Sequence, residues 1–255
     1  MTSTMFYNPL DGPMPVVGFM SGSGSNLVRL LERQKELKEL GHEAYRFTAI
    51  VTDRTTAEGS NALSIGNRFD IPVVQNPRSL FLKDRDAEKF TKETKTAYDI
   101  VTLNALQMLG IEYKFGAFAG YMTVASKKLC NKGLGVNVHP ADLALLGPDG
   151  WPIFTGDDAV KLTIEAGERY IRASTHILRP RKDCGPLLMR SKRMELDYDT
   201  TPKDNQDALK KVGDLVIFPK TLEFIALGRF GMDEDGKVCF DGEPVPNGLN
   251  LEDIE

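Results

Sequence analysis

One stretch decides the fold: Val16-Val17-Gly18-Phe19-Met20-Ser21-Gly22-Ser23-Gly24-Ser25-Asn26. Its first five residues are mostly apolar, which is typical of a buried strand, and the next six are small and polar. Four leucines at helical spacing then follow, at positions 27, 30, 31 and 37. The stretch therefore predicts a buried strand that leads through a glycine-rich loop into a helix.

The same alternation continues through the first half of the chain. Strands are predicted at residues 47–51, 71–74 and 115–119 and at Gly135–His139, and helices at residues 58–68, 84–109 and 126–130. Parallel strands need crossover connections, which helices usually supply. We therefore expect an α/β fold, a doubly wound and mostly parallel Rossmann-like sheet with helices on both faces.

The second half changes character. The sequence predicts, in order, a Gly- and Pro-rich loop at residues 146–156, a helix at 157–166, and two strands at 172–178 and 187–194 around a turn. A long helix with a break at Pro219 is predicted at residues 203–227. We expect an irregular lead-in over residues 1–15, a single domain over 16–235, and a tail over 236–255 that holds a short strand.

Composition limits the class of protein. The chain has 255 residues, 41% hydrophobic and 27% charged, with a net charge of −4. This length can bury a substantial core, and the acidic balance argues against a broad nucleic-acid interface. Cys130, Cys184 and Cys239 are isolated and form no CxxC, so we expect neither a metal site nor disulfides, in a cytoplasmic setting. Residues 1–15 do not resemble a leader, and no apolar run is long enough for a membrane span.

Several ligands suit the loop Gly22–Asn26. Glycines let the backbone approach a ligand, and a helix N-terminus presents amides to a phosphate. A nucleotide P-loop would end in Gly-Lys-Ser/Thr, which is absent. A dinucleotide site would need a third glycine where Leu27 stands, with Asp53 as a distant candidate for the ribose. The remaining interpretations are a single phosphate monoester and a tight turn capped by Ser25 or Asn26.

A second motif is Asn137-Val138-His139-Pro140, at the end of an apolar run. Residues i and i+2 of a strand point to one face, so the amide and the imidazole should project together. Pro140 ends the strand, because it has no N–H for the ladder. Ligands bind at the carboxyl ends of such strands, and an Asn beside a His can stabilise an oxyanion and move a proton.

A third motif is Asp183-Cys184-Gly185-Pro186, downstream of Ser174-Thr175-His176. An Asp before Gly-Pro is usually a turn former, and a lone His in a strand is usually a hydrogen-bonded, half-buried residue. His42, beside Gly41, is typical of a solvated helix end. A carboxylate beside His139 could instead raise its pKa, orient it, or take a proton through water.

In this order, the motifs resemble the phosphoribosylglycinamide (GAR) formyltransferase family. The resemblance also includes Ala119-Gly120-Tyr121-Met122 and holds from about Val16 to Leu227. Asn-x-His-Pro with Asp-x-Gly-Pro is similar to all folate formyltransferases, and the Gly-x-Gly-Ser-Asn loop to the GAR branch. The resemblance implies a transferase of purine biosynthesis and one-carbon metabolism, in which 10-formyltetrahydrofolate is the co-substrate and donates its formyl group to the primary amine of glycinamide ribonucleotide.

The resemblance also implies roles. Asn137 donates to the tetrahedral oxyanion, His139 stabilises it and handles a proton, and Asp183 pairs with His139 and takes the amine's proton through water. The implied phosphate ligands are Ser23, Gly24, Ser25 and Asn26, with Arg85 and Lys211 as weaker cationic candidates. Asp214 would touch the ribotide, and the pterin would lie near Tyr121, Met122, Thr123, Val124 and Ala125 and near the loop around Asp183. Ser174 and His176 would be supporting residues. The implied ligands are a ribotide amine in the first half of the domain and a folate in the second. The resemblance implies no nucleic acid, membrane or metal, and a monomer or homodimer.

Four segments depart from the family pattern. Thr123-Val124-Ala125 replaces Arg-Ile-Leu, residues 141–154 replace a Ser-Leu-Leu-Pro loop, Arg172 stands where glycine is typical, and a basic turn, Arg179–Lys182, precedes Asp183. The turn could serve the folate's glutamate tail, bind a different ligand, or simply be solvated.

Other functions stay open. These are transfer to another phosphorylated or sugar amine, hydrolysis of the folate, a folate- or nucleotide-binding relative without catalysis, and a Rossmann-type dehydrogenase. Deformylases usually carry an extra N-terminal domain and transfer-RNA formyltransferases a C-terminal basic one. Residues 1–15 and the tail after Gly236 are too short for these, so we expect neither.

Overall fold

A computed structural model describes residues 3–254 and divides them into two compact units. The amino-terminal unit comprises residues 13–137 and 178–180. The carboxyl-terminal unit comprises the chain up to Gly12, residues 138–177 and the chain from Arg181 onward. The chain passes from the first unit into the second within one strand, β6 (Leu134–His139). Each unit is described below by itself.

A parallel sheet forms the centre of the amino-terminal unit. Its strands run in the order β6-β5-β2-β3-β4, and the remaining four are β2 (Met14–Met20), β3 (Tyr45–Thr52), β4 (Val73–Gln75) and β5 (Phe115–Phe118). The chain builds outward from β2 to β3 and β4, then returns to the other side of β2 for β5 and β6. This reversal is the mark of a doubly wound sheet, so the predicted α/β class is confirmed.

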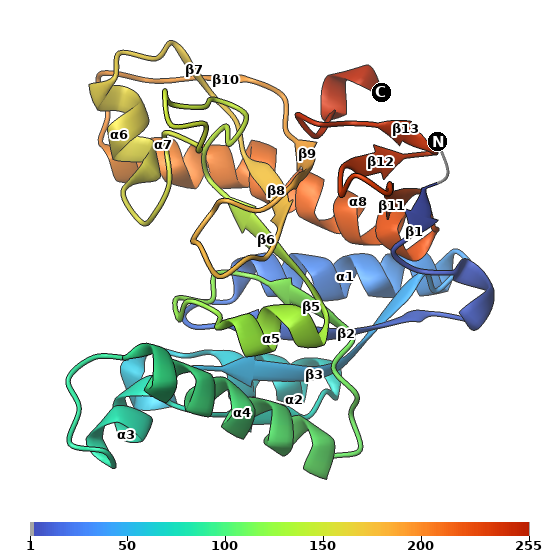
Figure 1. The fold of residues 1–255 in the computed structure, drawn as a ribbon, viewed down its shortest axis with the longest axis vertical. Helices are drawn as coiled ribbons and strands as arrows, with labels where there is room; N and C mark the ends of the chain where they lie inside the picture. The colour runs from blue at the N-terminus through green and yellow to red at the C-terminus, as the bar shows by residue number, and fades with distance from the viewer. Residues whose placement is uncertain (1–2, 255) are drawn as a thin grey trace. The chain divides into compact units, whose positions relative to one another are not determined.

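Helices cover both faces of this sheet. They are α1 (Ser25–Glu39), α2 (Ala62–Phe69), α3 (Arg78–Lys83), α4 (Lys92–Met108) and α5 (Lys127–Lys132), with a short turn, η2 (Thr56–Glu58). Helices α4 and α5 lie on the near face in Figure 1. On the other face Leu27 of α1 lies over Gly18, where a Cβ would meet its Cδ1 at 2.6 Å. Gly18 therefore lets α1 approach the central strand closely.

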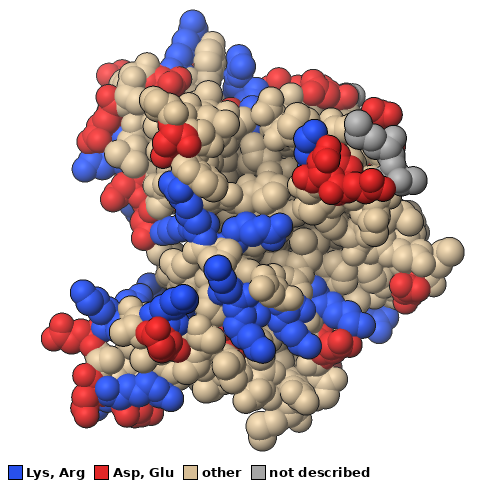
Figure 2. All heavy atoms as spheres, in the orientation of Figure 1, with Lys and Arg blue, Asp and Glu red and all other residues tan. Residues whose placement is uncertain are grey.

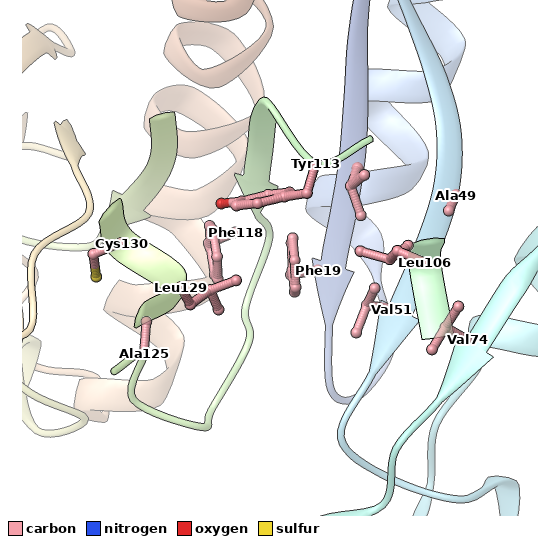
Figure 3. Close-up of a cluster of buried hydrophobic side chains, with 11 residues drawn as sticks. Phe19, Ala49, Val51, Val74, Leu106, Tyr113, Phe118, Ala125, Leu129 and Cys130 are labelled. Carbon is pink, nitrogen blue, oxygen red and sulfur yellow. The ribbon is translucent and has the colours of Figure 1, made fainter. Parts of the chain in front are cut away.

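An aromatic cluster fills the face under α4 and α5 (Figure 3). The rings of Phe19 and Phe118, on neighbouring strands, stack with centroids 4.3 Å apart, and Tyr113 meets Phe19 edge-on at 5.7 Å. Leu106 of α4 and Leu129 of α5 are fully buried in the same cluster. Aromatic pairs of this geometry add about 0.5–1.5 kcal/mol each beyond their burial, so this layer fixes the helices to the sheet.

Two details of the predicted helices are wrong. The helix predicted over residues 84–109 begins only at Lys92, because Thr91 starts α4 with a capping box in which its side chain accepts from Thr94 N, and α3 ends at Lys83, before the predicted range. The helix predicted over residues 58–68 begins later, at Ala62. A capping box at Thr91 sets the start of α4, whereas no side chain among residues 3–254 caps α2, and apolar periodicity reports neither start.

Short sheets and a long helix build the carboxyl-terminal unit. Strand β8 (Ser174–Ile177) pairs antiparallel with β9 (Leu187–Arg190), and β14 (Leu249–Asn250) pairs parallel with β9. A second sheet runs β1 (Thr4–Met5), β11 (Phe230–Met232), β12 (Val238–Phe240) and β13 (Glu243–Pro244). The other elements are β7 (Tyr170–Ile171) with β10 (Met194–Glu195), α6 (Ala159–Glu165), η1 (Pro9–Asp11) and η4 (Leu251–Asp253).

The predicted lead-in and tail contribute to this unit. Strand β1 supplies an edge of the second sheet, and β12, β13 and β14 all lie beyond Gly236. The tail therefore holds more strand than the single one predicted. Figure 2 shows Asp and Glu side chains gathered over this C-terminal part of the chain.

The long helix of this unit is irregular in one place. It comprises α7 (Pro202–Leu209), a π-helical turn η3 (Lys210–Asp214) and α8 (Leu215–Ala226). The predicted break at Pro219 is wrong, because α8 continues through the proline. The irregularity lies earlier, in the π-helical turn, and turns of this kind occur frequently at functional sites.

Candidate functional site

Two loops meet at the switch point of the amino-terminal sheet. One follows β2 and the other follows β5, the neighbouring strands from which the chain builds in opposite directions. Ser21 N donates to Gly120 O at 3.2 Å, and Met122 N donates to Ser21 Oγ at 2.8 Å. The switch point is where open α/β sheets bind ligands. Both loops that the sequence singled out therefore lie at the expected end of the sheet.

The loop after β2 is built for a close backbone approach. Gly24 is the N-cap of α1, with a left-handed φ of 70°. A Cβ there would lie 2.5 Å from Ile65 Cδ1 and 2.8 Å from Met20 Cε, so both the space and the left-handed φ favour glycine. No side chain caps α1, which contradicts capping by Ser25 or Asn26. Instead, the Ser25 hydroxyl oxygen is buried and has no hydrogen-bond partner within residues 3–254. Uncapped helix amides with a hydroxyl beside them suit a phosphate.

Buried carboxylates hold the loop after β5. Thr123 Oγ1 donates to Asp53 Oδ2 at 2.6 Å, and Ser126 N donates to Asp99 Oδ2 at 2.7 Å. Asp53 and Asp99 are 3% and 0% exposed, so these bonds act away from water. Lys95 pairs with Asp99, which keeps that charge balanced. Asp53, weighed as a ribose ligand, therefore has a structural partner in Thr123.

The backbone of residues 121–125 is held between these anchors. Met122 and Val124 are exposed, whereas Thr123 and Ala125 are buried, and Tyr121 donates a long bond of 3.4 Å to Tyr98. Burial raises the pKa of Tyr98 and of Tyr121, so both phenols stay neutral. The loop is therefore anchored by hydrogen bonds and presents alternate residues to solvent.

The other predicted ligands belong to both units, Arg85 to the amino-terminal one and Lys211 and Asp214 to the carboxyl-terminal one. The guanidinium of Arg85 stacks 3.7 Å from the ring of Phe81 and donates to Phe81 O, and the structure gives it no contact with residues 23–26 in the described chain. In the carboxyl-terminal unit, Lys211 is exposed and Asp214 is 7% exposed. Both lie in the π-helical turn η3.

The centre of the carboxyl-terminal unit is a carboxylate between two imidazoles. His139 Nδ1 lies 3.5 Å from Asp183 Oδ2, and His176 Nε2 lies 3.7 Å from Asp183 Oδ1. All three side chains are at most 6% exposed. Asp183 adopts a left-handed φ of 53°, which is rare for a residue with a side chain. Its contacts reach across the unit, so it is more than a former of its own turn.

Two backbone groups that the sequence does not reveal complete this cluster. Phe154 O lies 2.9 Å from His139 Nε2, and Gly156 N donates to Asp183 Oδ2 at 2.8 Å. A carbonyl can only accept, so Nε2 of His139 carries a proton, and Nδ1 faces the carboxylate. The altered loop after His139 therefore returns to clamp the imidazole through Phe154, whose ring is buried against Ala141 and Ala159. In the sequence, the one signal that singled out this loop was its departure from the pattern of the family it resembles.

Burial and hydrogen bonds set the protonation states. Burial lowers the pKa of His139 below 6.5, and the carboxylate of Asp183 opposes that shift only in part. Burial alone would raise the pKa of Asp183, but hydrogen bonds from His176 and Gly156 and the charge of His139 bring that pKa down to about 2. At neutral pH a neutral imidazole therefore faces a carboxylate, an arrangement that can accept a proton at Nδ1.

Ser174 braces the segment after the histidine. Its hydroxyl donates to Ala141 O at 2.7 Å and accepts from Leu143 N at 3.1 Å. His176 is fixed in turn, since its Nδ1 lies 3.1 Å from Ile177 O. Asn137, two residues before His139 in β6, is half-buried. The structure thus brings His139, Asp183 and His176 into one cluster, with Ser174 on the adjoining loop.

Comparisons with known proteins agree on the class. The family described as formyl transferase matches residues 14–222. The bovine trifunctional purine biosynthetic protein adenosine-3 is 22% identical over 227 residues, 88% of this chain and 20% of that protein. A solved structure of phosphoribosylglycinamide formyltransferase from Coxiella burnetii superposes with a TM-score of 0.72 at 22% identity, covering 93% of this chain and 99% of that one. A formyltetrahydrofolate deformylase from Pseudomonas putida gives 0.65 at 18% identity, covering 90% and 71%.

The chain belongs to the formyl transferase family. It spans about a fifth of the length of the curated relatives that it matches. None of the helices formed by residues 3–254 is long and apolar enough to cross a membrane.

Proposed function

We propose that this protein transfers the formyl group of 10-formyltetrahydrofolate to the primary amine of glycinamide ribonucleotide, a step of purine biosynthesis. The observation that carries the proposal is the pair His139 and Asp183, buried together at 3.5 Å on the two motifs that define the family resemblance. Solved structures of two relatives named as phosphoribosylglycinamide formyltransferases share the fold over nearly the whole chain. The cytoplasm fits a chain whose three cysteines are all unpaired.

The reaction needs an oxyanion stabiliser and a proton acceptor. The amine nitrogen attacks the formyl carbon, and the carbonyl electrons move to oxygen. We propose that Asn137 donates to that oxygen, an interaction worth roughly 3–4 kcal/mol when preorganised. The amine's proton passes to His139 Nδ1 or, through water, to Asp183. Collapse of the intermediate breaks the bond to the folate nitrogen, which takes up a proton.

The buried carboxylate of Asp183 favours proton uptake by His139 at the nitrogen that faces it. Neutral Nδ1 can accept a proton, and the imidazolium that forms lies beside Asp183, which stabilises it. Phe154 O holds the other nitrogen and so fixes the ring plane. Gly156 N donates to the carboxylate, and both it and His176 lower the pKa of Asp183, so the carboxylate stays ionised.

The substrate phosphate belongs, in this proposal, to the loop Gly22–Asn26. Three observations support this: Gly24 stands where a Cβ would clash, helix α1 has no side-chain cap among the described residues, and the Ser25 hydroxyl is buried. Arg85, Lys211 and Asp214 stay proposals for ribotide contacts. The pterin is assigned to the backbone of residues 121–125, which is held by Asp53 and by the Asp99–Ser126 bond.

A turnover assay tests the proposal. Purified protein is given 10-formyltetrahydrofolate with glycinamide ribonucleotide, or with the same amine lacking its phosphate, and tetrahydrofolate release is followed by absorbance. We expect release that requires the amine, with a KM at least tenfold lower for the phosphorylated form. Release at an equal rate without amine would identify a deformylase instead. Folate binding without release would identify a binding protein.

A further inference from the structure

Two charged side chains from distant parts of the sequence meet in the carboxyl-terminal unit. One is Arg172, two residues before β8, and the other is Asp142, in the loop directly after His139. Arg172 Nε lies 3.7 Å from Asp142 Oδ2, and the side chains are 6% and 14% exposed. Charges this deep are costly unless paired, so the contact has to be maintained. Arg172 and Asp142 therefore form one feature.

A second arginine completes the pairing. Arg190 Nη1 donates to both carboxylate oxygens of Asp142, each at 3.2 Å, and its side chain is 15% exposed. Arg172 and Arg190, the arginine clamp from here on, thus hold one carboxylate from two sides. Asp142 Oδ1 also accepts from Ala144 N at 3.1 Å. The clamp fixes the backbone at Asp142, three residues beyond His139.

The C-terminal segment closes over the clamp. Strand β14 pairs with β9 so that Asn250 stands opposite Arg190. Asn250 Oδ1 accepts from Arg172 Nη1 at 2.8 Å, and Glu252 Oε2 lies 3.8 Å from Arg172 Nη2. Glu252 also accepts from Arg193 N at 3.3 Å. Two arginines facing one buried aspartate carry excess positive charge, and the segment Leu249–Asp253 supplies the balancing oxygen atoms.

We propose that Asp142 is a positioning residue for His139, and that the segment Leu249–Asp253 keeps it in place through the arginine clamp. The C-terminal segment is then part of the catalytic machinery, acting through Arg172 and Asp142. This inference rests on the proposed function only where it concerns turnover. A shift of about 1 Å in a reacting group costs on the order of 100-fold in rate, so a displaced loop should be visible in kcat.

Hydrogen exchange tests the coupling without reference to activity. Asn250→Ala removes the contact of the C-terminal segment with Arg172 and leaves Asp142 and Arg190 intact. We expect faster amide exchange both in residues 249–253 and in residues 141–146, because the loop loses its brace. Faster exchange confined to residues 249–253 would overturn the coupling.

Steady-state kinetics test the positioning. Asp142→Asn should lower kcat at least tenfold while KM for the amine and for the folate changes less than threefold, since neither ligand is assigned to Asp142. Arg190→Lys keeps the charge but replaces the planar guanidinium that reaches both oxygens of Asp142 by a shorter, flexible amine, and should lower kcat by a smaller factor. The matched control is Glu195→Gln, which removes a carboxylate from an exposed pair with Arg169 in the same unit. It should leave both kcat and exchange unchanged.

The outcomes separate this inference from the proposed function. Wild-type kcat in folded Asp142→Asn and Arg190→Lys proteins overturns the positioning role. If Asp142→Asn does not fold, Arg190→Lys and Asn250→Ala decide the question. If the wild-type protein formylates no amine, the proposed function fails, while the exchange experiment still decides whether the C-terminal segment braces the loop.

Discussion

His139 Nδ1 and Asp183 Oδ2 lie 3.5 Å apart, and both side chains are almost fully buried. Burial holds the imidazole neutral, and its neighbours hold the carboxylate ionised. The pair can therefore take up one proton and stabilise it at once. An acyl transfer to an amine needs this capacity, because the amine must lose a proton as the new bond forms.

Replacing His139 tests its chemical role. His139→Gln should lower kcat by about 10²–10⁴-fold, the usual contribution of a positioned acid–base group. Folate binding, measured by fluorescence titration, should change little. His42→Gln is the matched control, since His42 is exposed and lies outside the cluster. Comparable turnover in both variants would remove His139 from the mechanism.

Replacing Asp183 tests the buried carboxylate. Its pKa is about 2 in the folded protein against 3.8 for the free group, a difference that corresponds to about 2 kcal/mol. This depressed pKa stabilises the fold above pH 4, and the contribution disappears as pH falls through 2. Asp183→Asn should therefore cost about 2 kcal/mol in urea unfolding at pH 7 and much less near pH 2.

The control for this variant is Asp157→Asn. Asp157 pairs with Lys182 at 2.6 Å, but its side chain is 65% exposed. Exposed pairs contribute at most about 1 kcal/mol. An Asp183→Asn protein as stable as wild type at pH 7 would show that the carboxylate is not held as described.

The pH dependence of stability reports on His139. Its pKa is lowered in the folded state, so below pH 6.5 the unfolded chain binds a proton that the folded chain does not. Stability should therefore fall as pH drops below 6.5. His139→Gln should flatten this slope in urea unfolding between pH 7 and 5. An unchanged slope would mean that other groups titrate there.

Two glycines of the phosphate loop make a matched pair. Gly24→Ala forces a Cβ to 2.5 Å from Ile65 at a φ of 70°, whereas a Cβ on Gly22 meets nothing within 4 Å. Gly24→Ala should cost about 1–3 kcal/mol and raise KM for the ribotide at least tenfold. Gly22→Ala should change unfolding free energy by less than about 1 kcal/mol. If both variants changed KM equally, the assignment of the substrate phosphate to this loop would be contradicted.

The Asp53–Thr123 bond should govern the folate loop. Thr123→Val removes the donor from a buried carboxylate whose other oxygen has no partner within residues 3–254. Leaving such a group unsatisfied costs about 1–3 kcal/mol or more. We expect lower stability in urea and a raised KM for the folate with little change for the amine. Thr48→Val, which loses only a 3.3 Å bond to Val16 O, is the control.

Local sequence patterns predicted the order of strands and helices well. The strand-loop-helix at Val16–Asn26 and the alternation after it are local and periodic, so the parallel sheet of the amino-terminal unit followed directly. The pairing of His139 with Asp183 followed from the family resemblance, because no local rule brings two distant turns together. The residue types in the two motifs that contain His139 and Asp183 were enough to identify both motifs.

The parts that the sequence did not predict depend on backbone or distant charge. The carbonyl of Phe154 reaches His139 as a backbone group, which any residue could supply. The arginine clamp joins three segments that are far apart in the chain, and buried pairs of this kind leave no periodic signal. The π-helical turn before Leu215 arises where no sequence pattern marks it, and so it escaped prediction.

The fate of the formyl carbon tests the central claim most directly. The protein is mixed in excess with 10-formyltetrahydrofolate labelled with ¹³C in the formyl group and with glycinamide ribonucleotide, and a single turnover is followed by NMR. The account predicts that the label moves from the folate to the amine of the ribotide, and that His139→Gln slows this transfer by at least 100-fold. Label appearing as formate, or transfer at the wild-type rate in His139→Gln, would contradict it.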